Sequence, residues 1–186
     1  MLYGTQTPRR RDAQRNRSAI VQAASEAMTT PRTAVGMSEI ARRAGVGQAT
    51  LYRHFPDRDA LTAAVIGYQI ERLELLVDAG GGDPGTFRRV LGELLRTQVT
   101  MRPLVFLVRR MDARSRRRFE QRVIAVLAEP LRHAQEAGCV RGDLVPSDLT
   151  LLFSMVEGVA GDPAAARRSI DLALDGVFRA APIAIT

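Results

Sequence analysis

Apolar residues recur along most of the chain at intervals of three and four positions, the spacing of an amphipathic helix. Between residues 12 and 28, for example, Ile20, Ala23, Ala24 and Ala27 fall on one stripe. No segment alternates apolar and polar residues with the period of two that a half-buried strand requires. The pattern predicts an all-α fold of about nine helices, over residues 12–28, 37–44, 48–55, 58–79, 87–101, 104–111, 115–137, 148–159 and 164–178.

Turn and capping residues divide these helices into two groups. Gly45 lies where a helix C-terminus favours a left-handed glycine, and Pro56 with Asp57 ends one short helix and caps a long one. Pro103 separates two later helices, and Pro130 is expected to kink the long helix that contains it. We therefore expect a basic N-terminal arm over residues 1–11, a three-helix domain over residues 12–57 and a larger helical domain over residues 58–186.

Charge narrows the choice of partner. The chain has 186 residues and a formal net charge of +7, and all 27 of its basic residues are arginine. Such an excess favours a polyanionic partner, nucleic acid first and an anionic membrane second. Without lysine there is no Walker-type phosphate loop and no Schiff-base nucleophile. One cysteine (Cys139) and two distant histidines (His54 and His133) offer neither an internal disulfide nor a zinc site, so no metal or cofactor is expected.

The sequence supports neither a secreted or membrane protein nor an enzyme. The chain has no secretory signal at its start and no apolar run of the ~20 residues that a membrane span needs, so we expect a cytoplasmic protein without a membrane partner. Catalysis by a Cys139–His133 nucleophile pair would need a third group and an oxyanion site, and neither can be named. We therefore expect that the chain is not an enzyme.

Residues 37–55 carry the most informative pattern, two short helices joined by a tight turn. Ile40, Ala41, Val46, Leu51 and Phe55 can close a small core between them. The outward positions of the second helix mix amide, methyl, hydroxyl and cationic groups, which read base edges and bind phosphates; they are Gln48, Ala49, Thr50, Tyr52, Arg53 and His54. This is a helix-turn-helix pattern, with the second helix as the reader of the DNA major groove.

Residues 14–66 resemble the DNA-binding domain of the TetR family of transcriptional repressors. The matching positions are Ile20, Ala23-Ala24, Ile40-Ala41, Ala44-Gly45-Val46, Thr50-Leu51-Tyr52-Arg53-His54-Phe55 and Leu61. The resemblance implies that Gln48, Ala49 and Thr50 read bases, and that Tyr52 and His54 contact phosphates or adjoining bases. It also places Ser38 at the DNA backbone or a groove edge, and Arg58, where the family usually has Lys, at a phosphate.

The sequence departs from the family at further places, among them Ala49, which is commonly Gly or Pro in relatives. Gly36 stands where Ser or Thr usually caps the second helix, and residues 29–32 replace a glycine–aromatic pair after the first helix. The resemblance implies a homodimeric, ligand-responsive repressor that a small-molecule effector releases from a palindromic operator. The departures motivate an alternative from another class, a ligand-sequestering or protein-binding module of the same fold without sequence-specific DNA recognition.

The resemblance also places an effector pocket and a dimer interface in the second domain. Candidates for the pocket are Leu91, Leu95, Phe106, Met111, Phe119, Val123, Leu127, Met155 and Glu157. Candidates for the interface are Leu152, Val156, Ile170, Leu174 and Val177. Simple core packing is the competing interpretation for most of the pocket residues. Glu157 is an acid on an apolar stretch, which suits a cationic ligand, although solvent or an interface arginine is its more usual neighbour.

Two clusters of arginine in the sequence have not yet been given a role. Residues 9–11 are all arginine and suit either an arm in the minor groove or a basic tail that adds non-specific attraction. Residues 102–122 hold eight arginines and two acidic residues. That segment suits an acidic ligand or a second nucleic-acid surface, but a solvated helix–helix joint is the favoured interpretation.

Overall fold

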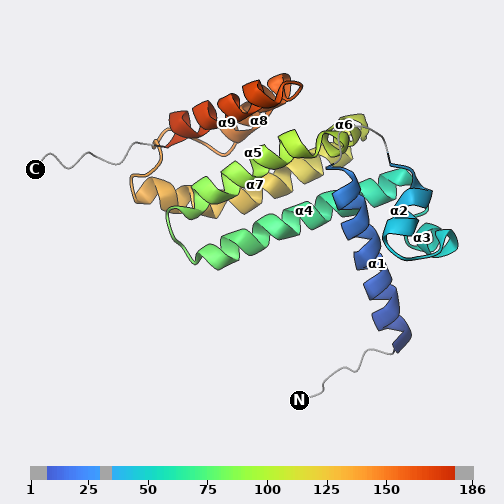
Figure 1. Ribbon diagram of the computed structural model, residues 1–186. Coiled ribbons are helices and arrows are strands. Elements are labelled where there is room, and N and C mark those ends of the chain that lie inside the picture. The colour runs from blue at the N-terminus through green and yellow to red at the C-terminus, as the bar shows by residue number, and fades with distance from the viewer. Residues whose placement is uncertain (1–7, 30–34, 179–186) are drawn as a thin grey trace, which may run out of the picture.

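A computed structural model describes residues 8–29 and 35–178, which contain nine α-helices (Figure 1). Their only β contact is one antiparallel bridge between Val140 and Phe178. The predicted all-α fold is therefore confirmed. The helices are α1 (Pro8–Ala27), α2 (Met37–Arg43), α3 (Gln48–His54), α4 (Arg58–Gly80), α5 (Thr86–Thr100), α6 (Arg102–Arg110), α7 (Ala113–Glu136), α8 (Asp148–Val159) and α9 (Pro163–Val177).

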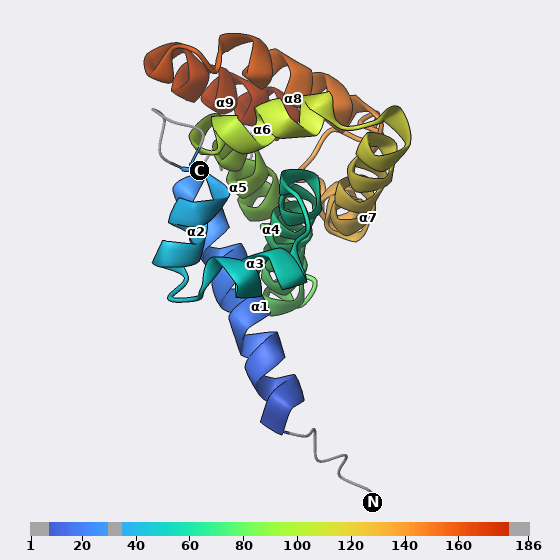
Figure 2. The same cartoon turned by 90° about the vertical axis from the view of Figure 1, so that its right-hand side faces the viewer.

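The larger group of helices packs in layers, with α4 on one side, α5 and α7 in the middle, and α8 with α9 on the other side (Figure 1). Helices α1, α2 and α3 sit together at one end of this stack, beside the start of α4 (Figures 1 and 2). No helix among the described residues is long and apolar enough to cross a lipid bilayer.

Two hydrophobic cores form, and α4 contributes to both. Leu61, Val65, Ile66 and Ile70 pack with the buried faces of α1, α2 and α3, whereas Leu73 belongs to the core of α5, α7, α8 and α9. Met101 and Leu104, at the junction of α5 and α6, also join the first core. The packing around α1 to α3 therefore extends well past the expected domain boundary at residue 58.

Aspartate side chains cap three of the helices, and the cap at Asp57 is the one that the sequence predicts. The Asp57 carboxylate accepts a hydrogen bond from the Ala60 amide at 2.7 Å, and Asp162 accepts from the Ala164 amide at 2.8 Å. At α7 the Asp112 carboxylate accepts from the Ser115 amide, so this helix begins two residues before its predicted start near Ser115. Pro130 lies inside α7, which is assigned as one continuous helix.

The N-terminal part of the chain differs from the prediction. Helix α1 begins at Pro8 and not at residue 12, so residues 9–11 are helical. The remainder of the expected arm, residues 1–7, lies outside the described residues. So do residues 30–34, which include most of the altered loop after the first helix.

Candidate nucleic-acid interface and ligand cavity

A tight turn sets the angle between α2 and α3. Gly45 has a φ of +68°, the left-handed conformation that the sequence predicts there and that glycine adopts without strain. The Val46 amide donates to the Ala41 carbonyl at 3.0 Å and closes the end of α2. The predicted small core is confirmed, because Ile40, Ala41, Leu51 and Phe55 are buried and Val46 packs against them.

The outer face of α3 is open to solvent. Gln48, Ala49 and Arg53 are exposed, Thr50 is half-buried, and 47% of Tyr52 is accessible. Leu51, on the opposite face, is completely buried and anchors the helix against the domain. The structure thus presents together the side chains that sequence reasoning assigns to base reading, and Ser38 is exposed on the neighbouring α2.

His54, the last residue of α3, is less open to solvent than its neighbours Tyr52 and Arg53. Its Nε2 atom is buried and has no hydrogen-bond partner among the described residues. The ring lies tilted beside Phe55, with the two centroids 6.4 Å apart. The residue as a whole is half-buried, so the contact of His54 with phosphates or adjoining bases stays a prediction.

Arg58 has a structural contact that the sequence did not indicate. Its Nη1 donates a hydrogen bond to the Val35 carbonyl at 3.0 Å, 23 residues earlier in the chain. This bond ties the start of α4 to the segment that leads into α2. Gly36 then begins α2 without a side-chain cap, as its residue type predicts. Arg58 therefore positions α2, and its remaining guanidinium N–H groups are the ones left for a phosphate.

The two arginines of α2, Arg42 and Arg43, are neutralised by an acid of the same helix. The Glu39 carboxylate accepts two hydrogen bonds from Arg42, each of 2.8 Å, and one from Arg43 at 2.9 Å. These bonds lower the pKa of the Glu39 carboxyl group to about 2. Arg42 and Arg43 are thereby paired with a carboxylate on their own helix, so the cationic side chain on the reader face is Arg53.

A cavity of about 450 Å³ opens between α4, α5, α6, α7 and α8. That volume is within the usual range of about 300–1,000 Å³ for small-molecule sites. Its apolar lining is Ile66, Ile70, Leu73, Leu94, Met101, Leu104, Val105, Val108, Phe119, Val123, Ile124 and Phe153. Its polar lining is Gln69, Thr97, Gln98, Arg109, Arg116, Glu120, Thr150, Ser154 and Glu157.

The charged residues of the cavity form pairs. Arg109 lies 3.1 Å from the Glu157 carboxylate, and Arg116 lies 3.7 Å from that of Glu120. Glu157 thus has an arginine of its own protomer as neighbour, within the cavity lining. One polar atom is left over, because the buried Oε1 of Gln98 has no hydrogen-bond partner among the described residues.

Gln69 links the cavity to the first domain. Its Nε2 donates a hydrogen bond of 2.7 Å to the Ser25 hydroxyl of α1, across 44 residues of sequence. Ser25 is one of the few buried polar residues among those described. The cavity wall is therefore hydrogen-bonded directly to a helix that supports α2 and α3.

The predicted pocket residues divide into three groups. Phe119, Val123 and Glu157 do line the cavity. Leu91, Leu95 and Leu127 are instead completely buried in the second core, because their helices turn those positions toward the neighbouring layer. Phe106 and Met155 are exposed by 59% and 63%, and Met111 packs against the first core outside the cavity.

The predicted interface residues mostly face inward. Val156, Ile170, Leu174 and Val177 are buried in the protomer's own core, and Leu152 packs against it half-buried. The apolar side chains that these two helices leave exposed are different ones, Leu151 and Met155 on α8 and Leu172 on α9. The interface prediction thus selected the inner face of each helix.

Sequence reasoning missed the contribution of α4 to the cavity. Ile66, Ile70 and Leu73 recur at intervals of four and three residues, which places them on one helix face. That face continues beyond the residues needed to cover α1, and this continuation is the signal that could have located the cavity wall.

Comparisons with known proteins agree with this geometry. The model of the bacterial regulatory proteins of the tetR family matches residues 20–65, and that of the SbtR-like transcriptional regulator C-terminal domain matches residues 83–179. The crystal structure of a TetR regulatory protein from Mycobacterium vanbaalenii is 30% identical, with a TM-score of 0.71, and the match covers 92% of this chain and 100% of that one. For the TetR regulator SCO0520 from Streptomyces coelicolor the identity is 26%, the TM-score 0.70, and the coverage 89% and 99%.

A curated relative matches over a short stretch of the chain. The HTH-type transcriptional regulator Rv1255c of Mycobacterium tuberculosis is 44% identical over 52 residues, which are 27% of this chain and 26% of that protein. The fold, the exposed reader helix and these matches define a helix-turn-helix DNA-binding transcriptional regulator. The chain belongs to the TetR family, whose members are regulators and not enzymes, so the expectation that it is not an enzyme is confirmed.

Proposed function

We propose that the protein is a homodimeric cytoplasmic repressor that a small-molecule effector releases from a palindromic operator. The observation that carries the proposal is the position of α4. This helix begins beside the reader unit, where Arg58 holds Val35, and then lines the cavity with Ile66, Gln69 and Ile70. An effector that binds the protein more tightly in one position of α4 than in another shifts the population toward that position, by an amount set by the difference between the two affinities. That shift changes the spacing of the two reader helices in the dimer.

The outer face of α3 carries the operator contacts in this proposal. Gln48 can read adenine through its amide, and the methyl group of Ala49 suits contact with a thymine methyl. Tyr52 and Arg53 reach the flanking backbone, and Ser38 adds a hydroxyl from α2. In a symmetric dimer the two reader helices enter major grooves about 34–36 Å apart on one face of the duplex.

Selection from random duplexes, followed by gel shifts, tests the operator proposal. We expect an enriched palindrome, and we expect Gln48→Ala to cost about 1–3 kcal/mol and to relax specificity at one base pair of each half-site. Tyr52→Ala should weaken binding to all sequences alike. Arg132→Ala, at the other end of the molecule, is the control. If no sequence is enriched, the repressor proposal fails and the alternative of a ligand-sequestering or protein-binding module is favoured.

The chemistry of the cavity points to an uncharged effector. The two arginines of the lining are each paired with a carboxylate, and most of the remaining lining is apolar. A ligand with a net charge would have to break one of these pairs or remain unpaired itself, and both are costly in a partly enclosed site. The free Oε1 of Gln98 suits a hydroxyl or N–H donor on the ligand.

Thermal-shift and calorimetric titrations with a panel of phenols and alcohols, beside carboxylates and amines of similar size, test this choice. We expect stabilisation by uncharged donors, and we expect Gln98→Leu to weaken their binding by about 3- to 10-fold, the worth of one hydrogen bond. Gln121→Leu, outside the cavity, should bind them as the wild type does. Stabilisation confined to the charged compounds would contradict the assignment.

The proposed dimer interface is the outer surface of α8 and α9. Support comes from Leu151, Met155 and Leu172, which are large apolar side chains exposed on adjacent helices. Light scattering after gel filtration tests it. A Leu151→Glu/Leu172→Glu variant should be monomeric, whereas Leu75→Glu, at an equally exposed leucine of α4, should remain dimeric. Dimeric behaviour of the double variant would refute this interface.

A further inference from the structure

One face of α7 carries three adjacent arginines. Arg114, Arg117, Arg118 and Gln121 are all exposed and, with Ala113, line a hollow on the surface. Their spacing of three, one and three residues places them on the same side of the helix. We call these three arginines and Gln121 the arginine face.

The arginines of this face have no ion pair with any carboxylate of the described residues, in contrast to three other arginines of α6 and α7. Arg116 pairs with Glu120, Arg122 with Glu74, and Arg109 with Glu157. Among nearby acids, the Asp112 carboxylate is occupied by the Ser115 amide at the helix N-terminus. The charges of Arg114, Arg117 and Arg118 are therefore uncompensated within the described part of the chain.

This arrangement is unfavourable for the helix itself. Like charges three and four residues apart repel one another, and cations near a helix N-terminus oppose the helix dipole. Packing does not explain the arginines either, because all three are exposed. Stability of α7 therefore gives no reason for this face, whereas a polyanion would turn the repulsion into attraction.

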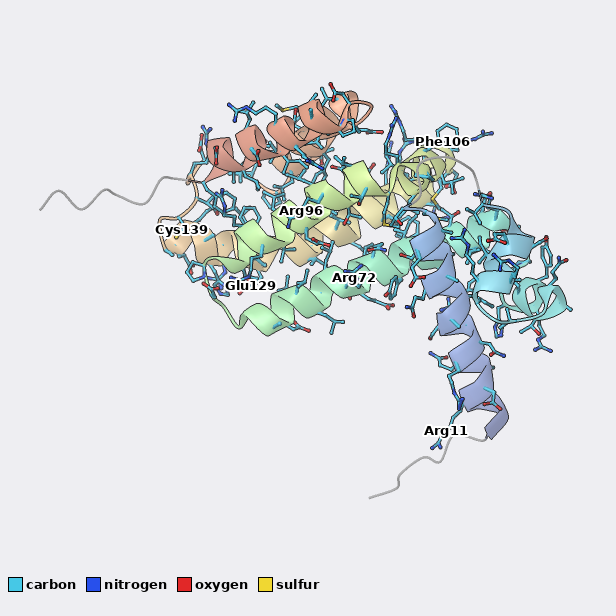
Figure 3. The ribbon with its side chains drawn as sticks, in the orientation of Figure 1. Arg11, Arg72, Arg96, Phe106, Glu129 and Cys139 are labelled. Carbon is cyan, nitrogen blue, oxygen red and sulfur yellow. The ribbon has the colours of Figure 1, made fainter. Side chains whose placement is uncertain are left out.

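The position of α7 in the fold indicates which polyanion binds the arginine face. The start of α7 and the adjoining α6 lie at the end of the molecule that carries α2 and α3, and all of them face the viewer in Figure 2. The end of α7 lies at the opposite side of the molecule, near Cys139 (Figure 3). A duplex that occupies the exposed face of α3 therefore passes on the side of the molecule where α7 begins, and α7 carries the arginine face close to its start.

We propose that the arginine face is a second DNA contact, which binds the phosphate backbone of the duplex that α3 reads. The contact is independent of base sequence, since guanidinium groups on an open helix face meet phosphates and not base edges. It raises the affinity for any duplex and leaves discrimination to α3. This assigns a ligand to the cluster of residues 102–122, for which a solvated joint was the favoured interpretation.

Salt dependence is the measurement that separates this contact from others. Each phosphate that the protein neutralises contributes about −0.9 to the slope of log affinity against log salt concentration. Arg114→Ala/Arg117→Ala/Arg118→Ala should therefore make the slope shallower by as much as about 3 for each protomer bound, and should weaken binding at low salt at least 10-fold. The probe is a fluorescent random-sequence duplex, titrated by anisotropy at about 50–200 mM KCl.

Two control variants distinguish the loss of this contact from a general loss of positive charge. Arg89→Ala/Arg132→Ala/Arg141→Ala removes the same formal charge from exposed sites at the other end of the molecule, and it should keep the wild-type slope. Arg114→Lys/Arg117→Lys/Arg118→Lys keeps the charge and should keep most of the slope. Circular dichroism establishes that each variant is folded.

Two results would overturn the proposal. The first is an unchanged slope in the folded alanine variant, which is also the result expected if the face takes an acidic small ligand or an anionic membrane. The second is an equal loss of slope in the distant control, which would attribute the effect to net charge alone. The test does not depend on an operator or an effector, so it can fail while the proposed repressor function stands.

Discussion

The hydrogen bond between Gln69 and Ser25 gives a measurable link between the cavity and the DNA-reading unit. Removing the hydroxyl by Ser25→Ala leaves the Gln69 amide without its 2.7 Å acceptor in a partly buried site. A neutral hydrogen bond of this kind is worth about 0.5–1.5 kcal/mol net. In a chain of this length, a loss of about 1 kcal/mol lowers the melting temperature by about 2–4 °C.

A double-mutant cycle isolates the interaction from the other effects of each substitution. We expect urea unfolding of the wild type, Ser25→Ala, Gln69→Leu and the double variant to give a coupling energy of about 1 kcal/mol. Ser154→Ala is the matched control, because Ser154 also lines the cavity but donates only to the Thr150 carbonyl of its own helix. A coupling energy below about 0.3 kcal/mol, which is within the scatter of additive sites, would refute the link.

Three further predictions concern the helix-turn-helix unit. Gly45→Ser places a residue with a side chain in a left-handed backbone conformation and should cost about 1 kcal/mol, or about 2–4 °C in melting temperature. Gly47→Ser in the same turn, at a φ of −68°, should not lower the melting temperature. Leu51→Ala should lower the free energy of unfolding by about 2–5 kcal/mol in urea titrations, and a loss below 1 kcal/mol would contradict the complete burial of this side chain. Because the pKa of Glu39 is lowered from 4.5 to about 2, its stabilising effect is full above pH 4.5 and is lost as the pH falls through about 2. The difference in melting temperature between the wild type and Glu39→Gln should therefore vanish near pH 2, and a difference that persists there would contradict the assignment.

The sequence predicts well those features that depend on one residue or on its immediate neighbours, such as helix bounds, turns and caps. The bounds of α8 are those predicted, and the left-handed Gly45 and the cap at Asp57 are present. In each case the conformational preference of one residue or its hydrogen bond to a nearby amide decides the structure. The buried core of the helix-turn-helix unit follows similarly, because two short helices and one turn offer few ways to bury their apolar residues.

The cavity and the outer surface of α8 were harder to predict because a helix between two layers can be apolar on more than one side. Periodicity identified Val156 and Met155 as apolar without indicating that the first is buried and the second exposed. The missing information is which neighbouring layer each face meets, and that depends on contacts between residues far apart in the chain. The burial of the His54 Nε2 atom and the bond from Arg58 to Val35 depend on tertiary contacts of the same kind.

The participation of α4 in both cores has a consequence for redesign. A fragment that ends before residue 58 would lack Leu61, Val65 and Ile70, which complete the core of the DNA-reading unit, so the reader cannot be transplanted as those residues alone. The same helix supplies Ile66 and Ile70 to the cavity wall. Substitutions chosen to alter ligand preference at those two positions would also disturb the packing beneath the reader, so sensor specificity and operator affinity cannot be tuned independently there.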